Sequence, residues 1–176
     1  MDERTVDYKH QMDEWHFIED LGLFFEQMGM SRMAGKVIGA LLIADPPNQS
    51  LTDLSTKLKA SKGSISQTTR MLIEQGLVER VATSLPRQTC YRFRPGGWVN
   101  YMQMWLGLMA ELHGITERGL VLMTEKSEET KERLMEAHDL FSSMEDQLPS
   151  VLASMEAERL RREPETESST GATQTR

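Results

Sequence analysis

The chain has 176 residues, of which 39% are apolar and 27% charged, and its formal net charge is −7. This composition is that of a soluble globular protein, and the lack of a run of ~20 apolar residues or of an apolar leader argues against a membrane span and against export. The single cysteine, Cys90, can form no internal disulfide, so we expect a cytoplasmic chain of one domain plus arms, without membrane contact.

Two helices are predicted at the N-terminal end. Over residues 7–29 the apolar side chains recur at spacings of three and four, the period of an amphipathic helix, and Gly29 can close that helix. Ser31 can cap a second helix, which the segment Asp45-Pro46-Pro47 then breaks.

Two shorter helices are predicted next, over about residues 51–60 and 64–75. Ser50 can cap the first and Gly76 can end the second. Residues 61–64 are expected to form the turn between them. Two short helices joined by a tight turn that contains glycine are typical of a helix-turn-helix.

Behind this pair the apolar period becomes that of a strand. Residues 77–81 and 89–94 are predicted as strands, joined by a turn over 84–88. In the second strand Thr89, Tyr91 and Phe93 are expected on one face, and Cys90, Arg92 and Arg94 on the other. A hairpin in this position is a wing.

Three helices are predicted in the C-terminal part. The first, over about residues 98–117, has a heptad-like apolar repeat; the second covers about 127–144; and Pro149 can open the third. The apolar stripes at the two ends of the chain exceed what a domain of this size can cover, which predicts a homodimer.

The predicted fold is therefore mainly α, a winged helix-turn-helix with a β-hairpin wing and N- and C-terminal dimerisation helices. We assign residues 1–30 to the N-terminal dimerisation helix and 31–97 to a DNA-binding domain. Residues 98–162 are assigned to C-terminal helices for dimerisation and a candidate effector pocket, and 163–176 to a disordered tail.

Positive charge is concentrated in one segment. Residues 51–94 contain eight basic and three acidic side chains, a net charge of +5, so the rest of the chain carries −12. A local basic face lets an acidic protein hold DNA. The alternative is that these side chains only solvate the module.

The start of the predicted helix over 64–75 carries groups that suit DNA. Hydroxyls and N–H groups at a helix N-terminus suit phosphate oxygens, and Gln67 and Arg70 are long enough to reach base edges. Lys62, expected ahead of the helix, would meet phosphate. The candidate DNA-binding residues are Ser61, Lys62, Ser64, Ser66, Gln67, Thr68, Arg70 and, at the wing tip, Arg87. The alternative is that Ser61 and Ser64 only cap the helix.

Six motifs occur in order between Phe17 and Trp98. They are residues 20–26 (DLGLFFE), 29–37 (GMSRMAGKV), 44–47 (ADPP), 61–66 (SKGSIS), 76–81 (GLVERV) and 91–98 (YRFRPGGW). This series resembles the MarR-type winged-helix regulators, in their GbsR-like branch. The resemblance implies a homodimeric regulator whose terminal helices dimerise and whose helix over 64–75 enters the major groove. The wings of that family commonly carry an aspartate near the tip arginine, which residues 84–88 lack.

Other chemistry has weaker support in the sequence. The four histidines show no metal-ligand spacing, and no phosphate loop or catalytic motif stands out, so we predict no metal, no cofactor and no enzymatic activity. Cys90 is interpreted as a passive strand residue. The alternative is an oxidation sensor whose thiolate Arg92 and Arg94 would favour.

An effector site is a further hypothesis. Aromatic side chains share one face of the helix over 98–117, and two from the N-terminal helix could close the site. The candidate residues are Trp15, Phe24, Trp98, Tyr101, Met102 and Trp105. A small apolar ligand could bias the spacing of two recognition helices there; the alternative is a fully packed core.

Together these patterns predict a homodimeric regulator that binds a specific sequence in double-stranded DNA, a repressor released by a small apolar effector. One alternative is a protein-interaction module that keeps the winged helix as a scaffold. Another is an enzyme near the tryptophans, for which we find no convergent titratable groups.

Overall fold

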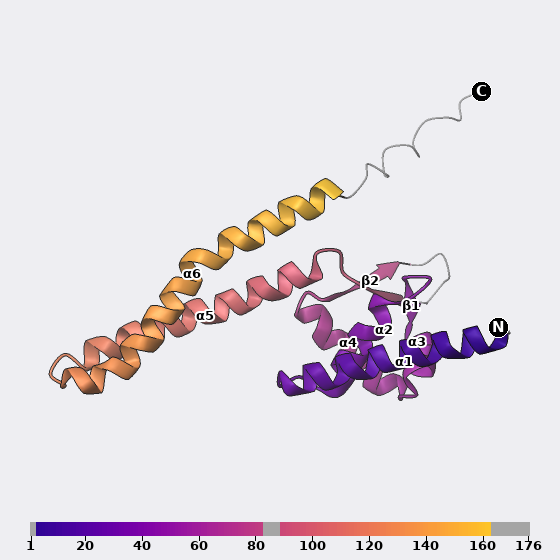
Figure 1. Ribbon diagram of the computed structural model, residues 1–176, viewed down its shortest axis with the longest axis horizontal. Helices are drawn as coiled ribbons and strands as arrows, with labels where there is room; N and C mark the ends of the chain where they lie inside the picture. Colours follow the sequence, from indigo (N-terminus) through magenta and orange to yellow (C-terminus); the bar gives the residue numbers. More distant parts are fainter. Residues whose placement is uncertain (1–2, 83–88, 163–176) are drawn as a thin grey trace, which may run out of the picture. The chain divides into compact units, whose positions relative to one another are not determined.

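The protein is described by a computed structural model that covers residues 3–82 and 89–162. These residues form two compact units, one ending at Tyr101 and the other beginning at Met102, so the boundary falls inside α5 (Gly97–Leu122). Most of the described chain is helical, with one small antiparallel sheet (Figure 1). The predicted mainly α class is therefore confirmed. Over these same residues, no helix is long and apolar enough to cross a membrane.

Helices α1 (Glu3–Gln27) and α2 (Arg32–Leu42) pack closely against each other. Ser31 caps α2 as predicted, because its side chain accepts the Ala34 N–H at 3.1 Å. Much of α2 is buried, and Val37 and Ile38 have no exposed surface. The contact is made at backbone level: a Cβ built on Gly35 would lie 2.8 Å from the Cα of Gly22 in α1. Part of the core of the first unit therefore lies where α1 and α2 cross, and the helices approach so closely there that only glycine fits at position 35.

The next two helices are shorter, α3 (Leu51–Leu58) and α4 (Lys62–Glu74). Ser50 caps α3 as predicted. The turn predicted over residues 61–64 is wrong, because Ser61 caps α4 by accepting the Ser64 N–H at 3.2 Å, and Lys62 is already helical. The corner between the helices lies at Lys59, whose φ of 50° is in the left-handed region.

The cap of α3 is reciprocal, and it yields a pH-dependent prediction. The Ser50 side chain accepts the Asp53 N–H at 3.2 Å, while the Ser50 hydroxyl and N–H donate to the Asp53 carboxylate at 2.6 and 2.9 Å. The Ser50 hydroxyl, and then its N–H, lower the pKa of Asp53. A lowered folded-state pKa stabilises the fold above the unfolded-state pKa, and this contribution is lost as pH falls through the folded-state value.

We expect Asp53→Asn to lower the free energy of unfolding by about 1 kcal/mol near pH 7, because the amide is a weaker cap acceptor. The difference from the parent should be constant near neutral pH and shrink as the pH falls through the ordinary aspartate pKa of ~3.9 and below it, because the folded-state pKa is lowered. Urea denaturation across this range measures it, with Asp13→Asn on α1 as the control. If the free energies of unfolding of the variant and the parent differ by the same amount at every pH, the Asp53 carboxylate does not stabilise the cap of α3.

The sheet has three strands, in the order β1-β3-β2: β1 (Gln49–Ser50), β2 (Val78–Ala82) and β3 (Thr89–Phe93). In the wing pair, Val78 lies opposite Phe93 and Ala82 opposite Thr89. The sequence did not predict β1, which is too short to show a period. The residues between β2 and β3, including Arg87 and the predicted turn, lie outside the described chain.

The simple alternation predicted for β3 is wrong at its centre. The neighbouring side chains of Cys90 and Tyr91 are both buried, at 7% and 5% exposure, whereas Thr89 is exposed. β3 is the central strand, paired on both edges and contacted by α2 and α3. Because side chains that follow each other along a strand point to opposite faces, both faces of β3 are covered at Cys90 and Tyr91, unlike the alternating pattern of a strand with one solvated face.

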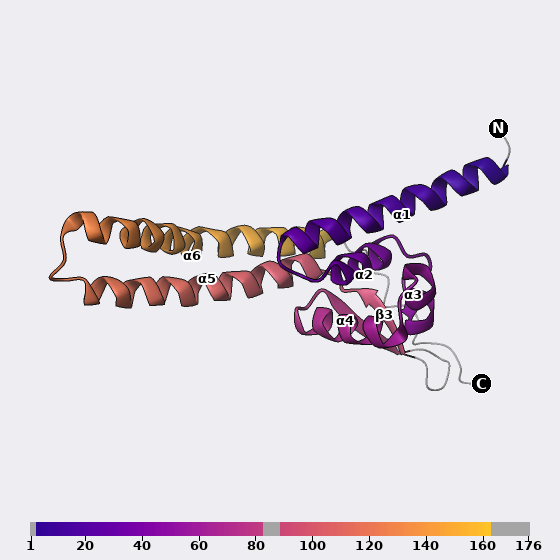
Figure 2. The ribbon, with the colours of Figure 1, turned by 90° about the horizontal axis from the view of Figure 1, so that it is seen from below.

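The second unit is a helical hairpin of α5 and α6 (Glu128–Arg162), which run back along each other from the turn that joins them and diverge towards the C-terminal end of α6 (Figure 1 and Figure 2). α5 extends five residues beyond the predicted end. The predicted break at Pro149 is wrong, since α6 runs through it without interruption. A proline removes one N–H from the helical ladder, and the neighbouring turn gains a bond from the Ser150 hydroxyl to the Gln147 carbonyl at 2.8 Å.

Candidate nucleic-acid interface

Helix α4 has one buried and one exposed face. Ile65, Thr69 and Leu72 point into the core with 0–1% exposure. On the other side Gly63, Gln67 and Arg70 are exposed at spacings of four and three, which places them on one helical face. Gln67 and Arg70, both predicted from the sequence to bind DNA, are therefore open to solvent.

The other predicted residues of α4 differ in accessibility. Ser64 and Ser66 are half-buried, and the Ser61 side-chain oxygen already serves as the N-cap. Thr68 is only 8% exposed, contrary to our expectation, because the helical period places it beside Ile65 and Leu72. We therefore leave Thr68 out of the interface.

The first turn of α4 presents backbone donors. The N–H groups of Lys62 and Gly63 open the helix, so no carbonyl of the same helix lies four residues before them. The space beside Gly63 is open, because a Cβ there would meet only the Ser61 Oγ, at 3.9 Å. With the Lys62 side chain exposed next to them, these groups form a site that suits a phosphate oxygen.

Ion pairs reduce the positive charge that the segment 51–94 can offer. Arg92 and Arg94 both reach Glu79, with Nε to carboxylate distances of 2.6 and 3.4 Å, and Lys57 Nζ lies 3.0 Å from Glu14. Among the described residues of this segment, the exposed cations that form no ion pair are Lys59, Lys62, Arg70 and Arg80. Two of these four lie on α4, so the uncompensated charge is near the face that carries Gln67.

The two predicted effector residues of α1, Trp15 and Phe24, lie in different surroundings. The Trp98 ring stacks on Phe25 with centroids 6.2 Å apart and lies 5.1 Å from Phe93, and Phe24 meets Phe25 edge-on at 5.5 Å. Trp15 lies nine residues before Phe24 on α1, about 13 Å along the axis.

Trp15 lines a different pocket, of about 310 Å³, between α1, α2 and α3. Its other lining residues are Ile18, Glu19, Lys36, Lys57, Leu58 and Lys59. Of the remaining candidates, Tyr101 is 6% exposed and its hydroxyl contacts the Met30 sulfur at 3.6 Å, Met102 is 42% exposed, and Trp105 is half-buried.

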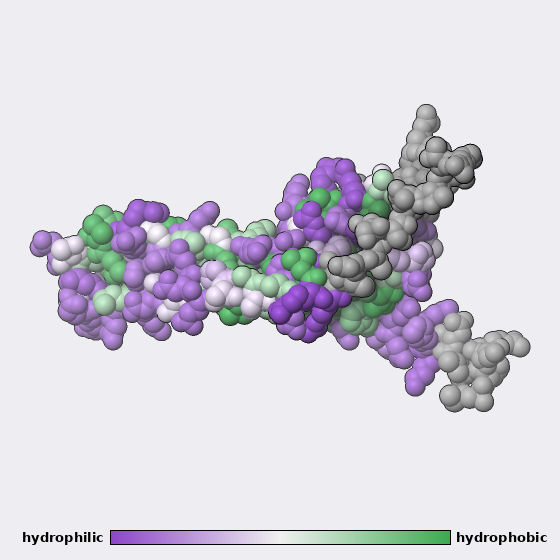
Figure 3. Space-filling view, turned by 90° about the horizontal axis from the view of Figure 1, so that it is seen from above, coloured by the Kyte–Doolittle hydropathy of each residue, from purple (hydrophilic) through white to green (hydrophobic). Residues whose placement is uncertain are grey.

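Apolar side chains interrupt the polar surface of the α5–α6 unit (Figure 3). On α5, Leu108, Ile115 and Leu122 recur every seven residues and are 47%, 54% and 84% exposed. This spacing aligns them along one side of the helix. We call these three residues the α5 stripe.

Comparison with known proteins gives consistent similarities. A family model described as "MmpR5-like MarR family transcriptional regulator" matches residues 96–158, which are α5 and most of α6. The HTH-type transcriptional regulator MmpR5 of Mycobacterium tuberculosis is 36% identical over 140 residues, 80% of this chain and 85% of that protein. The crystal structure of a transcriptional regulator is 35% identical, covers 82% of this chain and 99% of its own, and superposes with a TM-score of 0.71. The family model thus matches the C-terminal helices, whereas the six sequence motifs lie almost entirely ahead of them and overlap the matched range only at residues 96–98.

Proposed function

Because this chain belongs to the MarR family of transcriptional regulators, we propose that it is a homodimeric repressor that binds a specific sequence in double-stranded DNA. The observation that carries the proposal is the exposed face of α4, where Gln67 and Arg70 are unobstructed beside open N–H groups. We call α4 the recognition helix from here on. Assignment to a GbsR-like branch stays a prediction, supported by the six motifs alone.

The recognition helix would enter the major groove with its N-terminal end. Lys62 and the first N–H groups would bind phosphate and set the register, while Gln67 and Arg70 would contact base edges. The hydroxyls of Ser61, Ser64 and Ser66 are proposed to assist at the backbone, and Arg87 to reach the minor groove. Repression is the simplest consequence, since a dimer seated on a promoter excludes other proteins from it.

Homodimerisation is proposed through the N- and C-terminal helices, with the domain limits predicted above. Its support is the amount of exposed apolar surface there, including the α5 stripe and, on α1, Phe17 and Phe24 at 39% and 53% exposure. A two-fold axis would place two half-sites about one helical turn apart on the DNA.

Ile115→Glu should shift the protein from dimer to monomer at micromolar concentration, because it places a charge in the middle of the α5 stripe. Gln103→Glu adds the same charge at an exposed polar position on the same helix and should remain dimeric. Light scattering after size exclusion measures both. A parent protein that is already a monomer would refute the dimer.

A small apolar effector remains part of the proposal. The support is the flexible, partly exposed methionines of α5, Met102 and Met104. Trp98 contacts Phe25 and Phe93 but is itself 41% exposed, so at this position it lies neither in a closed pocket nor in a fully packed core. A protein-interaction module, the second candidate, has the exposed apolar helix surfaces in its favour.

The test of function is a gel shift with the DNA upstream of the protein's own gene, at two salt concentrations. The regulator should bind saturably as a dimer and more weakly at high salt, and an apolar effector should release the DNA. If the protein binds no duplex at low salt, the interaction module is the better hypothesis. If no hydrophobic metabolite releases the DNA, the hypothesis of an apolar effector is wrong.

A further inference from the structure

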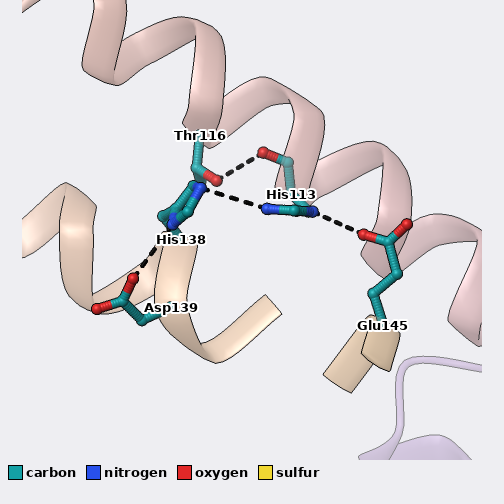
Figure 4. Close-up of polar contacts among 5 residues, drawn as sticks. All are labelled: His113, Thr116, His138, Asp139 and Glu145. Atoms are coloured by element: carbon teal, nitrogen blue, oxygen red, sulfur yellow. Dashed lines mark hydrogen bonds and ion pairs between the residues drawn. The ribbon is translucent and has the colours of Figure 1, made fainter. Parts of the chain in front are cut away.

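Two histidines from different helices meet within the α5–α6 unit (Figure 4). His113 on α5 and His138 on α6 are 25 residues apart in sequence, and their Nε2 atoms lie 3.3 Å from each other. The ring centroids are 4.8 Å apart, with the planes inclined by 60°, so the rings are not stacked. The side chains are 23% and 26% exposed, which leaves the pair within reach of solvent.

A carboxylate lies behind each ring. The His113 Nδ1 is 2.6 Å from Glu145 Oε2, and the His138 Nδ1 is 3.2 Å from Asp139 Oδ1. An ionised carboxylate only accepts hydrogen bonds, so each carboxylate favours the tautomer of its ring with the hydrogen on Nδ1. In that tautomer both Nε2 atoms carry lone pairs, and these lie at contact distance. A cation shared by the two nitrogens would turn this repulsion into attraction.

The spacing fits one class of cation. A tetrahedral zinc ion with Zn–N bonds of 2.0–2.1 Å holds two nitrogen ligands about 3.4 Å apart, close to the separation of 3.3 Å seen here. A carboxylate on the far nitrogen is also the usual partner of a metal-bound histidine, since it fixes the tautomer and raises the basicity of the ligand. The arrangement therefore has both the ligand spacing and the supporting groups of a metal site.

We propose that His113 and His138 bind a divalent transition metal ion of the zinc type through their Nε2 atoms, with water in the remaining positions. No group of three or more His, Cys, Asp or Glu side chains in the described chain is arranged to hold a metal, so the protein supplies two ligands. Two ligands give weaker binding than the four of a structural zinc site, with a dissociation constant on the order of 10 µM. The ion would join α5 to α6, so its binding would stabilise the hairpin.

The sequence predicts no metal site because its histidines show no ligand spacing of a local motif. The 25 residues between His113 and His138 correspond to no local motif. They are brought together by the lengths of the two helices and the turn between them.

The test is calorimetric titration of the full-length, metal-free protein with Zn²⁺. One ion should bind per chain, and it should raise the melting temperature. His113→Gln and His138→Gln, which keep a polar side chain of similar size, should each weaken binding at least ~10-fold. The control His16→Gln, on α1, should bind like the parent. Co²⁺ in place of Zn²⁺ should give visible absorption bands that both variants lose.

Glu145→Gln adds a second measurement, because it keeps both ligands and alters only the group behind His113. It should weaken Zn²⁺ binding about 10-fold, with an unchanged circular dichroism spectrum. The proposal is overturned if the parent binds no Zn²⁺ at millimolar concentration, the result expected of a pair that holds only a proton. It is equally overturned if the His113 and His138 variants bind as tightly as the parent.

Discussion

Replacing Gly35 by alanine should lower the free energy of unfolding by about 3 kcal/mol, the upper end of what overpacking a core usually costs. The added methyl would lie 2.8 Å from the Cα of Gly22 and closer still to the carbonyl oxygen of Leu21. Both are backbone atoms, so no side-chain rotation relieves the overlap. α1 and α2 would have to separate, which exposes buried residues such as Val37 and Ile38.

Gly107→Ala is the matched control for this substitution. Gly107 lies in the interior of α5, and a Cβ there meets nothing within 4 Å. Alanine at an open helical position should stabilise the helix by up to about 1 kcal/mol. Chemical denaturation measures the free energy of unfolding of both variants, which should fall for Gly35→Ala and rise for Gly107→Ala. Equal stabilities for the Gly35 variant and the parent would mean that the two helices are not in close contact in solution.

The largest effect on DNA binding is expected at Arg70. Its loss to alanine should cost about 1–3 kcal/mol at the specific site, roughly a 5- to 150-fold loss of affinity, and relax the preference at one base position. The reason is that Arg70 is exposed on the recognition helix and forms no ion pair within the described residues. Fluorescence anisotropy with the specific duplex and with single-base variants measures both effects.

Lys62→Ala should behave differently, because Lys62 is the first residue of the recognition helix, beside the open N–H groups. It should weaken binding to all sequences alike and lower the salt slope by about one unit. Arg133→Ala, an exposed arginine of α6, controls for general loss of charge. If the Arg70 and Lys62 variants both bind like the parent at low and high salt, α4 is not the recognition helix.

Local interactions were the most predictable part of the fold. Ser31 and Ser50 were identified as N-caps because a cap depends on residues within one turn. Ser61 has the same capability, but the following Lys-Gly pair favoured a turn in our interpretation, and the helix start was placed two residues too late. Pro149 was taken as a helix start for a similar reason, since the preference of proline for the first helical turn was given more weight than the helix-forming residues on either side of it.

Features that depend on distant segments were not predictable. β1 exists because Gln49 and Ser50 pair with Tyr91 and Cys90, some forty residues later, and two residues carry no period of their own. Thr68 is buried because its side of α4 packs against the core. A polar residue gives no sign of this in the sequence. The facing of His113 and His138 depends on how α5 and α6 align, which no local pattern encodes.

The burial of Cys90 has a practical consequence for spectroscopy. The chain has a single thiol, and it lies in the central strand with 7% exposure, where a labelling reagent has little access. A thiol-directed label should therefore leave the natural protein largely unlabelled, so Cys90 need not be replaced before a new cysteine is introduced. A cysteine placed at the exposed position of Glu74, at the end of the recognition helix, would accept a spin label selectively. In a dimer, the separation of two such labels would report the distance between the recognition helices, with and without DNA.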